Sequence, residues 1–283
     1  MASAPDSRPT KGSPVTTAEL SKLEPPPTIE QPPVIGDVHE GFEARTYVSQ
    51  DGQRLLYRLF RPPNYDPRKR YPLIVFLHGA SGRGTDNLTQ LTGSRTIGTT
   101  FWTDTERQSR HPAFVIAPQV DGKKHDNWVR QWRRPAAGLT EPLEMLVELL
   151  PQLAREFPID PSRLYLTGYS MGGFGTWIGI SRHPELFAGA LPICGGGDPS
   201  PVSASRTPVW AFHGTADRIV PVRRSREMVK ALKSAGSKPR YNEYNGVGHS
   251  VWERAFEEPD LEEWLFSNRA RMGYSEAARK REG

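Results

Sequence analysis

A serine lies at the centre of the pentapeptide GYSMG, at residues 168–172, directly after the apolar segment 164–167. This is a G-x-S-x-G pattern between a predicted strand and a predicted helix. A serine hydroxyl is a weak nucleophile, so it must project from a tight turn toward a base, with backbone N–H groups nearby. Glycines two residues either side of Ser170 have no Cβ to clash in such a turn. The pattern predicts a nucleophilic Ser170; the alternative is a glycine-rich turn with an ordinary capping serine.

Two further segments carry a candidate acid and a candidate base at the ends of predicted strands. Asp217 follows the apolar segment 209–212 in the sequence HGTAD, and His249 follows the segment 240–244 in the sequence GVGH. In an open α/β sheet, ligands bind at the crevice outside the carboxyl ends of the strands. Ser170, Asp217 and His249 therefore fall on one edge, in the chain order nucleophile, acid, base.

The elements that must position these side chains alternate between strand and helix. Segments 44–49 and 55–60 flank an Asp-Gly pair at residues 51–52, as in a β-hairpin. The short apolar segments 73–77 and 113–117 are typical of strands buried on both faces of a parallel sheet. The remaining predicted elements are a leucine-rich helix around residues 143–153, a strand at 164–167, a helix at 172–182, strands at 188–193 and 209–212, a helix at 222–234, a strand at 240–244 and a helix at 261–270. This alternation predicts an α/β fold with one open, mostly parallel sheet and helices on both faces.

With these motifs, the chain resembles the α/β-hydrolase superfamily, and within it the dienelactone hydrolase and prolyl-oligopeptidase-type esterases, which include feruloyl-esterase-like carboxylesterases. The resemblance runs from about Asp51 to Trp264 and rests on YPLIVFLHGASGRGTDN, IDPSRLYLTGYSMGGFGTW, HGTADRIVP and GVGHSVW. It implies the α/β-hydrolase fold, with an N-terminal antiparallel hairpin beside the mostly parallel sheet. Dienelactone hydrolases proper use a cysteine nucleophile, whereas this chain has Ser170, so the resemblance does not extend to that activity.

The resemblance implies a catalytic role for each of the three side chains. Ser170 would attack an acyl carbon, His249 would take its proton and later return it, and Asp217 would fix the imidazole tautomer. An oxyanion hole needs two backbone N–H donors, which we expect from Met171 and from Ala80.

His78 precedes Ala80 in the loop after segment 73–77. The resemblance gives His78 no place in the triad, so we expect its side chain to hold the loop in shape.

Three tryptophans lie close to this edge in the sequence. Trp128 and Trp132 lie in the loop after segment 113–117, and Trp252 follows His249 closely. Their rings could line the substrate site by stacking on an aromatic acyl group or a sugar ring. The alternative is that the loop tryptophans pack the loop onto the sheet.

For two other candidate side chains we expect a structural role. Asp198 rivals Asp217 as the acid, but it ends a different strand and is expected to cap a turn. Cys194 is the only cysteine, so it forms no intrachain disulfide, and we expect a buried small hydrophobe. A cysteine-based zinc site would need more ligands, and no nucleotide-binding pattern is present, so we expect neither metal nor cofactor.

Length and composition limit the remaining possibilities. The 283 residues are 36% hydrophobic and 24% charged, as in a globular protein with a substantial core. The net charge is +5, but the basic residues form no dense patch, so we expect no nucleic-acid partner. No stretch approaches the roughly 18 apolar residues of a membrane span.

Residues 1–37 are rich in proline and polar residues, which predicts a disordered tail or linker, and residues 38–283 then form a single catalytic domain. The tail has no apolar signal-peptide core, which is consistent with a cytoplasmic protein or with an exported one whose signal has been removed.

The sequence therefore favours a serine carboxylic-ester hydrolase that acts through an acyl-enzyme on small, aromatic or carbohydrate-linked esters. A prolyl-oligopeptidase-type peptidase would share the same serine turn, but it usually carries a large gating domain for which we expect no room here. A catalytically silent relative could bind polysaccharide through Trp128 and Trp132, but the intact Ser170, Asp217 and His249 argue against it. The sequence does not predict the oligomeric state.

Overall fold

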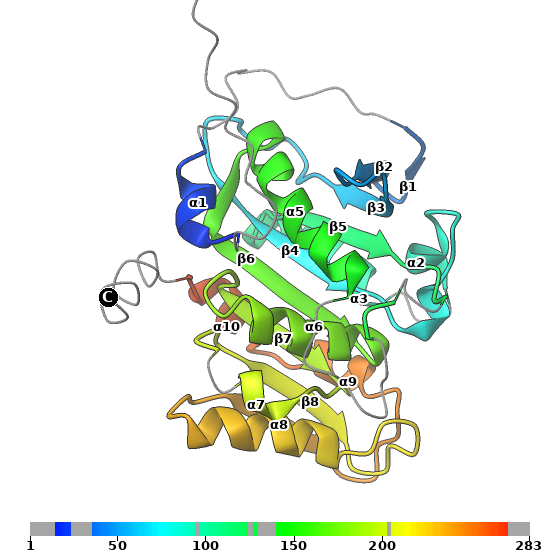
Figure 1. The fold of residues 1–283 in the computed structure, drawn as a ribbon, viewed down its shortest axis with the longest axis vertical. Helices are drawn as coiled ribbons and strands as arrows, with labels where there is room; N and C mark the ends of the chain where they lie inside the picture. The colour runs from blue at the N-terminus through cyan, green and yellow to red at the C-terminus, as the bar shows by residue number, and fades with distance from the viewer. Residues whose placement is uncertain are drawn as a thin grey trace, which may run out of the picture.

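The computed structural model describes residues 15–23, 36–93, 97–123, 127–129, 140–202 and 205–270. Within these residues, nine strands form one sheet in the order β1-β2-β3-β5-β4-β6-β7-β8-β9 (Figure 1). The strands are β1 (Val38–His39), β2 (Phe42–Val48), β3 (Arg54–Phe60), β4 (Tyr71–Leu77), β5 (Phe114–Gln119), β6 (Ile159–Tyr169), β7 (Gly189–Ile193), β8 (Trp210–Gly214) and β9 (Arg240–Tyr244). The first three pairs of this order, β1–β2, β2–β3 and β3–β5, are antiparallel. The other five pairs, from β5–β4 to β8–β9, are parallel.

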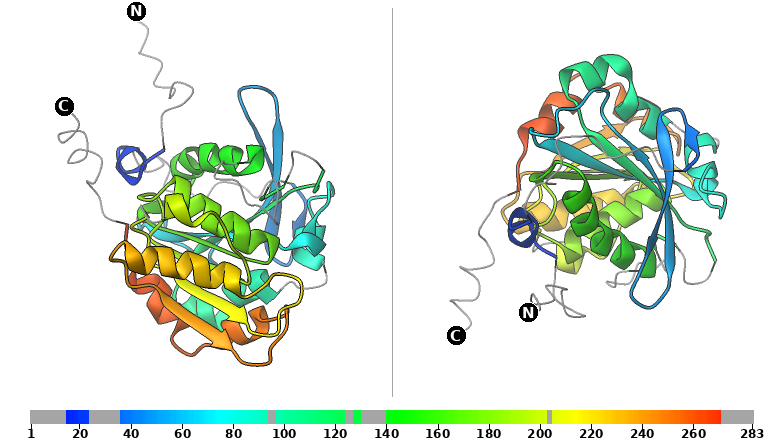
Figure 2. Two further views of the ribbon diagram at one scale, coloured as in Figure 1. Left: turned by 60° about the horizontal axis from the view of Figure 1, so that its bottom comes forward. Right: turned by 90° about the horizontal axis from the view of Figure 1, so that it is seen from above.

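Helices cover both faces of the sheet (Figure 2), because its central strands carry apolar side chains on both sides. One face is covered by α5 (Glu141–Glu156), α6 (Met171–Arg182) and α8 (Arg223–Ser234), and the other by α3 (Ile97–Thr103), α9 (Trp252–Phe256) and α10 (Leu261–Ser267). The remaining helices of the described residues are α1 (Thr17–Ser21), α2 (Thr89–Thr92), α4 (Thr105–Arg110), α7 (Pro199–Val202) and the 3₁₀ turn η1 (Ala80–Gly82). In the described part of the chain, no helix has the length and apolar character to cross a membrane.

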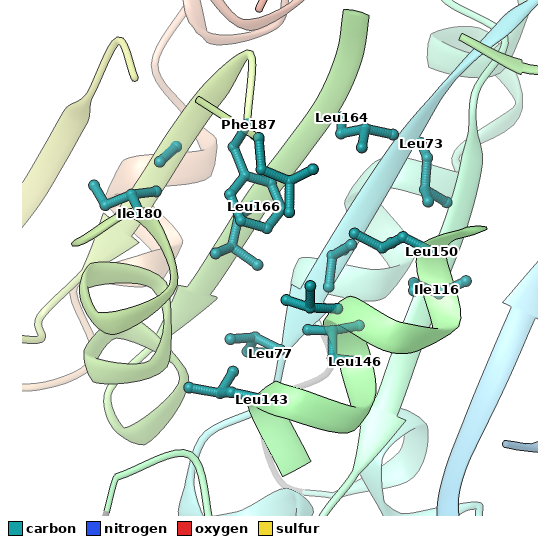
Figure 3. Packing of buried hydrophobic residues seen from close by; sticks show 14 of the residues in the cluster. Leu73, Leu77, Ile116, Leu143, Leu146, Leu150, Leu164, Leu166, Ile180 and Phe187 are labelled. Atoms are coloured by element: carbon teal, nitrogen blue, oxygen red, sulfur yellow. The ribbon is translucent and has the colours of Figure 1, made fainter. Parts of the chain in front are cut away.

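Strand β4 illustrates how the two cores form. Leu73 and Leu77 belong to the core under α5 and α6, whereas Phe76 belongs to the core on the opposite face, because side chains alternate along a strand. In Figure 3, Leu143 and Leu146 of α5 contribute to the first of these cores. Burying each such leucine contributes about 2 kcal/mol, so this packing fixes α5 and α6 on the sheet.

The predicted α/β fold with a mostly parallel sheet and an N-terminal antiparallel hairpin is confirmed. The hairpin consists of β2 and β3, which pair along their full length. The prediction missed α3 and α4, which lie between β4 and β5. Phe101 and Trp102 anchor α3 in the core, but threonines around them hide the apolar spacing of a helix.

Residues 15–23 correct the prediction of a disordered tail over residues 1–37. Thr16 and Glu19 form a capping box, in which the Glu19 N–H donates to Thr16 Oγ1 at 3.1 Å and the Thr16 N–H donates to Glu19 Oε2 at 3.0 Å. Leu20 is 2% exposed and lies in the core, and the Thr17 hydroxyl donates to the carbonyl of Glu185 at 2.8 Å. This segment is therefore a helix docked on the domain; residues 1–14 and 24–35 lie outside the described residues.

The loops after β4 and β6 are held close together at the carboxyl edge of the sheet. The two strands pair in parallel up to Leu77 and Gly168. A Cβ on Gly172 would lie 1.9 Å from the Leu77 carbonyl oxygen, and a Cβ on Gly79 would lie 2.5 Å from the ring of Tyr169. Only glycine permits these approaches, so the two glycines bring the predicted oxyanion loop against the start of α6.

Candidate active site

Ser170 occupies a strained turn between β6 and α6. Its backbone angles are φ 55° and ψ −117°, a conformation that costs a non-glycine residue about 1–3 kcal/mol. The Ser170 N–H donates to the carbonyl of Ile193 at 2.9 Å, and the Ser170 carbonyl accepts from the N–H of Phe174 at 3.0 Å. These contacts with β7 and α6 hold the turn, so the hydroxyl is presented at the end of the strand.

The side chains of Ser170, His249 and Asp217 form a continuous hydrogen-bonded chain. His249 Nε2 lies 2.8 Å from Ser170 Oγ, and His249 Nδ1 lies 2.7 Å from Asp217 Oδ2. A carboxylate only accepts hydrogen bonds, so Nδ1 donates to it and Nε2 is left as the acceptor that faces the serine hydroxyl. This arrangement can withdraw a proton from Ser170 and make its oxygen nucleophilic.

The carboxylate of Asp217 is buried and fixed by several donors. Its Oδ1 accepts from the N–H groups of Ile219 and Val220 at 2.8 and 2.9 Å. Burial alone would raise the pKa of Asp217, but hydrogen bonds from His213, His249 and the Val220 N–H hold this pKa well below its usual range. Asp217 is therefore ionised at neutral pH.

Cys194 lies beside this chain, at the end of β7, and is fully buried. Its sulfur and the potential ligand atoms of Asp217 and His249 all lie within 4.8 Å of one another. Burial raises the pKa of the Cys194 thiol well above its ordinary value, so the thiol stays protonated and is a poor metal ligand. Both nitrogens of His249 already have partners, so these residues do not fit a metal site.

His78 holds the loop after β4. Its Nε2 accepts from the Val120 N–H at 3.2 Å, and its Nδ1 lies 2.6 Å from the carbonyl oxygen of Gly79, to which it donates. Burial lowers the pKa of His78 to about 4, so the ring is neutral. The side chain thus links the loop to the end of β5, which agrees with the loop-holding role that we expected.

Ala80 and Met171 both begin helical turns at this edge. Ala80 is the first residue of η1, and Met171 is the first residue of α6. The N–H of a first helical residue has no acceptor within its own helix. Within their own helices, both N–H groups are therefore left without an acceptor.

The prediction that three tryptophans line the substrate site is wrong for two of them. Trp128 is fully buried in the core, and its indole N–H donates to the carbonyl of His78 at 3.1 Å. Trp252 is 4% exposed and packs edge-on against the His249 ring, with centroids 5.6 Å apart. Trp128 therefore packs the loop onto the domain and Trp252 supports the imidazole, whereas Trp132 lies outside the described residues.

Because of two buried histidines, we expect the folded protein to lose stability in mild acid. Burial lowers the pKa of His78 and of His183 to about 4, from an ordinary value of 6.5. Below pH 6.5 the unfolded chain binds protons that the folded chain does not, so stability falls as the pH drops from 6.5 toward 4. Each histidine should remove about 2 kcal/mol between pH 7 and pH 5.

Urea unfolding at the two pH values measures this effect, with His183→Leu as the test variant. Among the described residues, neither ring nitrogen of His183 has a hydrogen-bond partner, so leucine should be tolerated there. The variant should lose about half of the pH dependence. An unchanged dependence in His183→Leu would show that His183 is not neutral in the folded protein.

The chain is similar to several known hydrolases. A thermostable esterase of known structure superimposes with a TM-score of 0.76 at 40% identity, covering 81% of this chain and 64% of its own. The poly(3-hydroxyalkanoate) depolymerase C of Paucimonas lemoignei is 32% identical over 128 residues, which are 44% of this chain and 28% of the depolymerase. The bifunctional acetylxylan esterase/xylanase XynS20E of Neocallimastix patriciarum is 26% identical over 178 residues, which are 62% of this chain and 23% of that protein. The chain thus spans less than two thirds of each of these proteins.

The family model described as "Putative esterase" matches residues 52–265, the range that contains all the strands from β4 to β9 and the candidate site. Because this match covers most of the chain, and the fold is that of the thermostable esterase, the chain belongs to the Putative esterase family and has the α/β-hydrolase fold.

Proposed function

We propose that the protein is a serine carboxylesterase that acts through an acyl-enzyme, with Ser170 as nucleophile, His249 as base and Asp217 as the acid that orients it. The observation that supports this most strongly is the continuous hydrogen-bonded chain from Ser170 Oγ through His249 to Asp217, with links of 2.8 and 2.7 Å. The ionised state of Asp217 supports the same assignment, because it stabilises the imidazolium that forms in the reaction.

In the first half of the proposed reaction, Ser170 Oγ attacks the acyl carbon while its proton passes to His249 Nε2. The negative charge on the acyl oxygen is received by the N–H groups of Met171 and Ala80. The tetrahedral intermediate collapses as His249 gives the proton to the alcohol leaving group. In the second half, water takes the place of the serine: His249 accepts its proton, and the acid is released with Ser170 regenerated.

Small, aromatic and carbohydrate-linked esters are the proposed substrates. Two relatives carry names that refer to polymer-borne esters, a polyhydroxyalkanoate in one and acetylated xylan in the other. The mechanism needs no cofactor, since the nucleophile, the base and the charge all come from side chains.

A substrate panel tests the proposal. It contains p-nitrophenyl acetate, p-nitrophenyl butyrate, a feruloyl ester, acetylated xylan and a proline-containing peptide p-nitroanilide. We expect turnover of esters at rates well above that of the amide, since an alcohol leaves more easily than an amine. Faster cleavage of the amide would assign a peptidase instead, and folded protein that turns over none of them would support a silent binding relative.

Replacing Ala80 with proline tests the assigned oxyanion donor. Proline is tolerated at the first position of a helical turn, and the preceding Gly79 has extended angles (φ −74°, ψ −177°) that suit a following proline. The variant removes the N–H and adds a ring at an exposed position, so kcat should fall about 10²- to 10³-fold with stability nearly unchanged. Ala80→Gly, which keeps the N–H, is the matched control. If Ala80→Pro retains full kcat on p-nitrophenyl butyrate, the donor is another group.

A further inference from the structure

A second histidine contacts the Asp217 carboxylate from the buried side. His213, near the end of β8, is fully buried, and its Nε2 lies 3.3 Å from Asp217 Oδ2 and 2.9 Å from the carbonyl oxygen of Val220. Both of these oxygens only accept hydrogen bonds, so Nε2 carries a proton that the two share. His249 approaches the same Oδ2 from the other side at 2.7 Å. Asp217 Oδ2 therefore has an imidazole nitrogen on each side, and the contact with His213 is the longer of the two.

Ser225 on α8 holds the other nitrogen of this ring. Its hydroxyl oxygen lies 2.7 Å from His213 Nδ1 and 3.2 Å from the carbonyl oxygen of Gly195, and the side chain is fully buried. These contacts fix the plane of the imidazole so that Nε2 faces Asp217. Asp217 thus lies between two serine–histidine pairs, of which only the pair formed by Ser170 and His249 is partly exposed.

We propose that His213 is a positioning residue of the candidate triad: by donating to Asp217 Oδ2 from the buried side, it holds the carboxylate toward His249 and limits the negative charge presented to that ring. This inference rests on the proposed function, because it assigns His213 a task in a reaction carried by Ser170, His249 and Asp217.

The number of hydrogen-bond donors to Asp217 explains why we expect His213 to affect the reaction. Two backbone N–H groups donate to Asp217 Oδ1, His249 donates to Oδ2, and the His213 Nε2 proton faces Oδ2 at 3.3 Å as a fourth donor. Without His213, the buried carboxylate would lose one of its four donors and would be held less firmly in its place beside His249. It would also bear more charge toward His249 and stabilise the imidazolium more strongly. The first effect lowers kcat, and the second moves the acid limb of the kcat/KM profile to higher pH.

The other titratable groups close to this pair do not obscure that limb. Cys194, at the end of β7, has a pKa raised by burial and stays neutral. Glu243 on β9 pairs in register with His213, and its carboxylate is bound to Arg226 of α8 at 2.6 Å, which lowers its pKa. Neither group changes charge between pH 5 and pH 8, so a shifted limb in this range reports on the triad.

The test compares the pH profile of kcat/KM on p-nitrophenyl butyrate for the wild type, His213→Leu and His213→Gln. Leucine removes the donor, and a glutamine amide can restore an N–H near the position of Nε2. For His213→Leu we expect kcat to fall about 10- to 100-fold, which is the worth of one hydrogen bond to a buried charge, with KM little changed. The acid limb should move up by about half a pH unit or more. Glutamine should recover most of the activity and return the limb toward that of the wild type.

A second measurement needs no folded variant of His213. In wild-type protein with ¹⁵N-labelled histidine, we expect two protected imidazole N–H signals at low field, from His249 Nδ1 and His213 Nε2. A fluorophosphonate that modifies Ser170 should shift both signals, because both protons share Asp217 Oδ2.

Three outcomes separate the possibilities. A purely structural role predicts a lower melting temperature for both variants with the acid limb unmoved, and a His213 signal that does not respond to modification of Ser170; either result overturns the inference. Wild-type protein that neither hydrolyses the ester nor reacts with the fluorophosphonate contradicts the proposed function itself. If His213→Leu does not fold, the His213→Gln profile and the wild-type signals decide.

Discussion

Ser170→Ala is expected to lower kcat for p-nitrophenyl butyrate about 10⁴- to 10⁶-fold, because it removes the atom that forms the acyl-enzyme. The fold should survive, since the backbone contacts of Ser170 with Ile193 and Phe174 do not use the hydroxyl. The free energy of unfolding should change by less than about 1 kcal/mol. Steady-state hydrolysis and thermal unfolding of the same preparation measure both quantities.

Ser181→Ala is the matched control for that variant. Ser181 lies on α6, the helix that follows Ser170, and its hydroxyl donates to the carbonyl of Trp177 at 2.7 Å. Its replacement should leave kcat within about twofold of the wild type. If the Ser170→Ala protein retains a tenth of the wild-type kcat, Ser170 is not the nucleophile.

Asp217→Asn is expected to lower kcat about 10³- to 10⁴-fold while the geometry stays intact. An asparagine amide can donate to His249 Nδ1, which favours the tautomer with the proton on Nε2, and that nitrogen can then no longer accept from Ser170. The amide also cannot stabilise an imidazolium. The loss should lie in kcat, with a smaller change in KM, and steady-state kinetics on p-nitrophenyl butyrate measures it.

Asp198→Asn is the control that decides between the two acids. As expected from the sequence, Asp198 caps a turn: its Oδ1 accepts from the Ser200 N–H at 2.9 Å. It should therefore change kcat by less than about twofold. If Asp198→Asn proves as damaging as Asp217→Asn, the assignment of the acid is wrong.

The sheet could be predicted because its central strands are short apolar runs. Residues 73–77 and 113–117 have no polar face, so only a sheet covered on both sides can bury them, and they are found in β4 and β5. The helix α1 could not be predicted in the same way. Its docking depends on one buried leucine, Leu20, and on a hydroxyl contact with Glu185, which is 168 positions away from Thr17 in the chain.

The shared edge of the site could be predicted because Ser170, Asp217 and His249 each follow a predicted strand, at the edge where the strands end. The direction in which each loop side chain points could not be predicted, because it depends on the path of the loop. Trp128 follows the same strand as the other loop residues, yet its ring turns into the core and donates to His78. Sequence reasoning also gave no role to His213, although it begins the HGTAD segment, four positions before Asp217.

The most direct test of the central claim is covalent labelling of the wild-type protein with a fluorophosphonate, followed by peptide mass spectrometry. A hydroxyl activated by His249 should attack phosphorus and displace fluoride, leaving one adduct per chain on the peptide that contains Ser170. Labelling should also slow sharply in acid, because a protonated base cannot accept the proton of Ser170. Folded protein that stays unlabelled at neutral pH, or that carries its adduct on a different residue, would contradict the proposed mechanism.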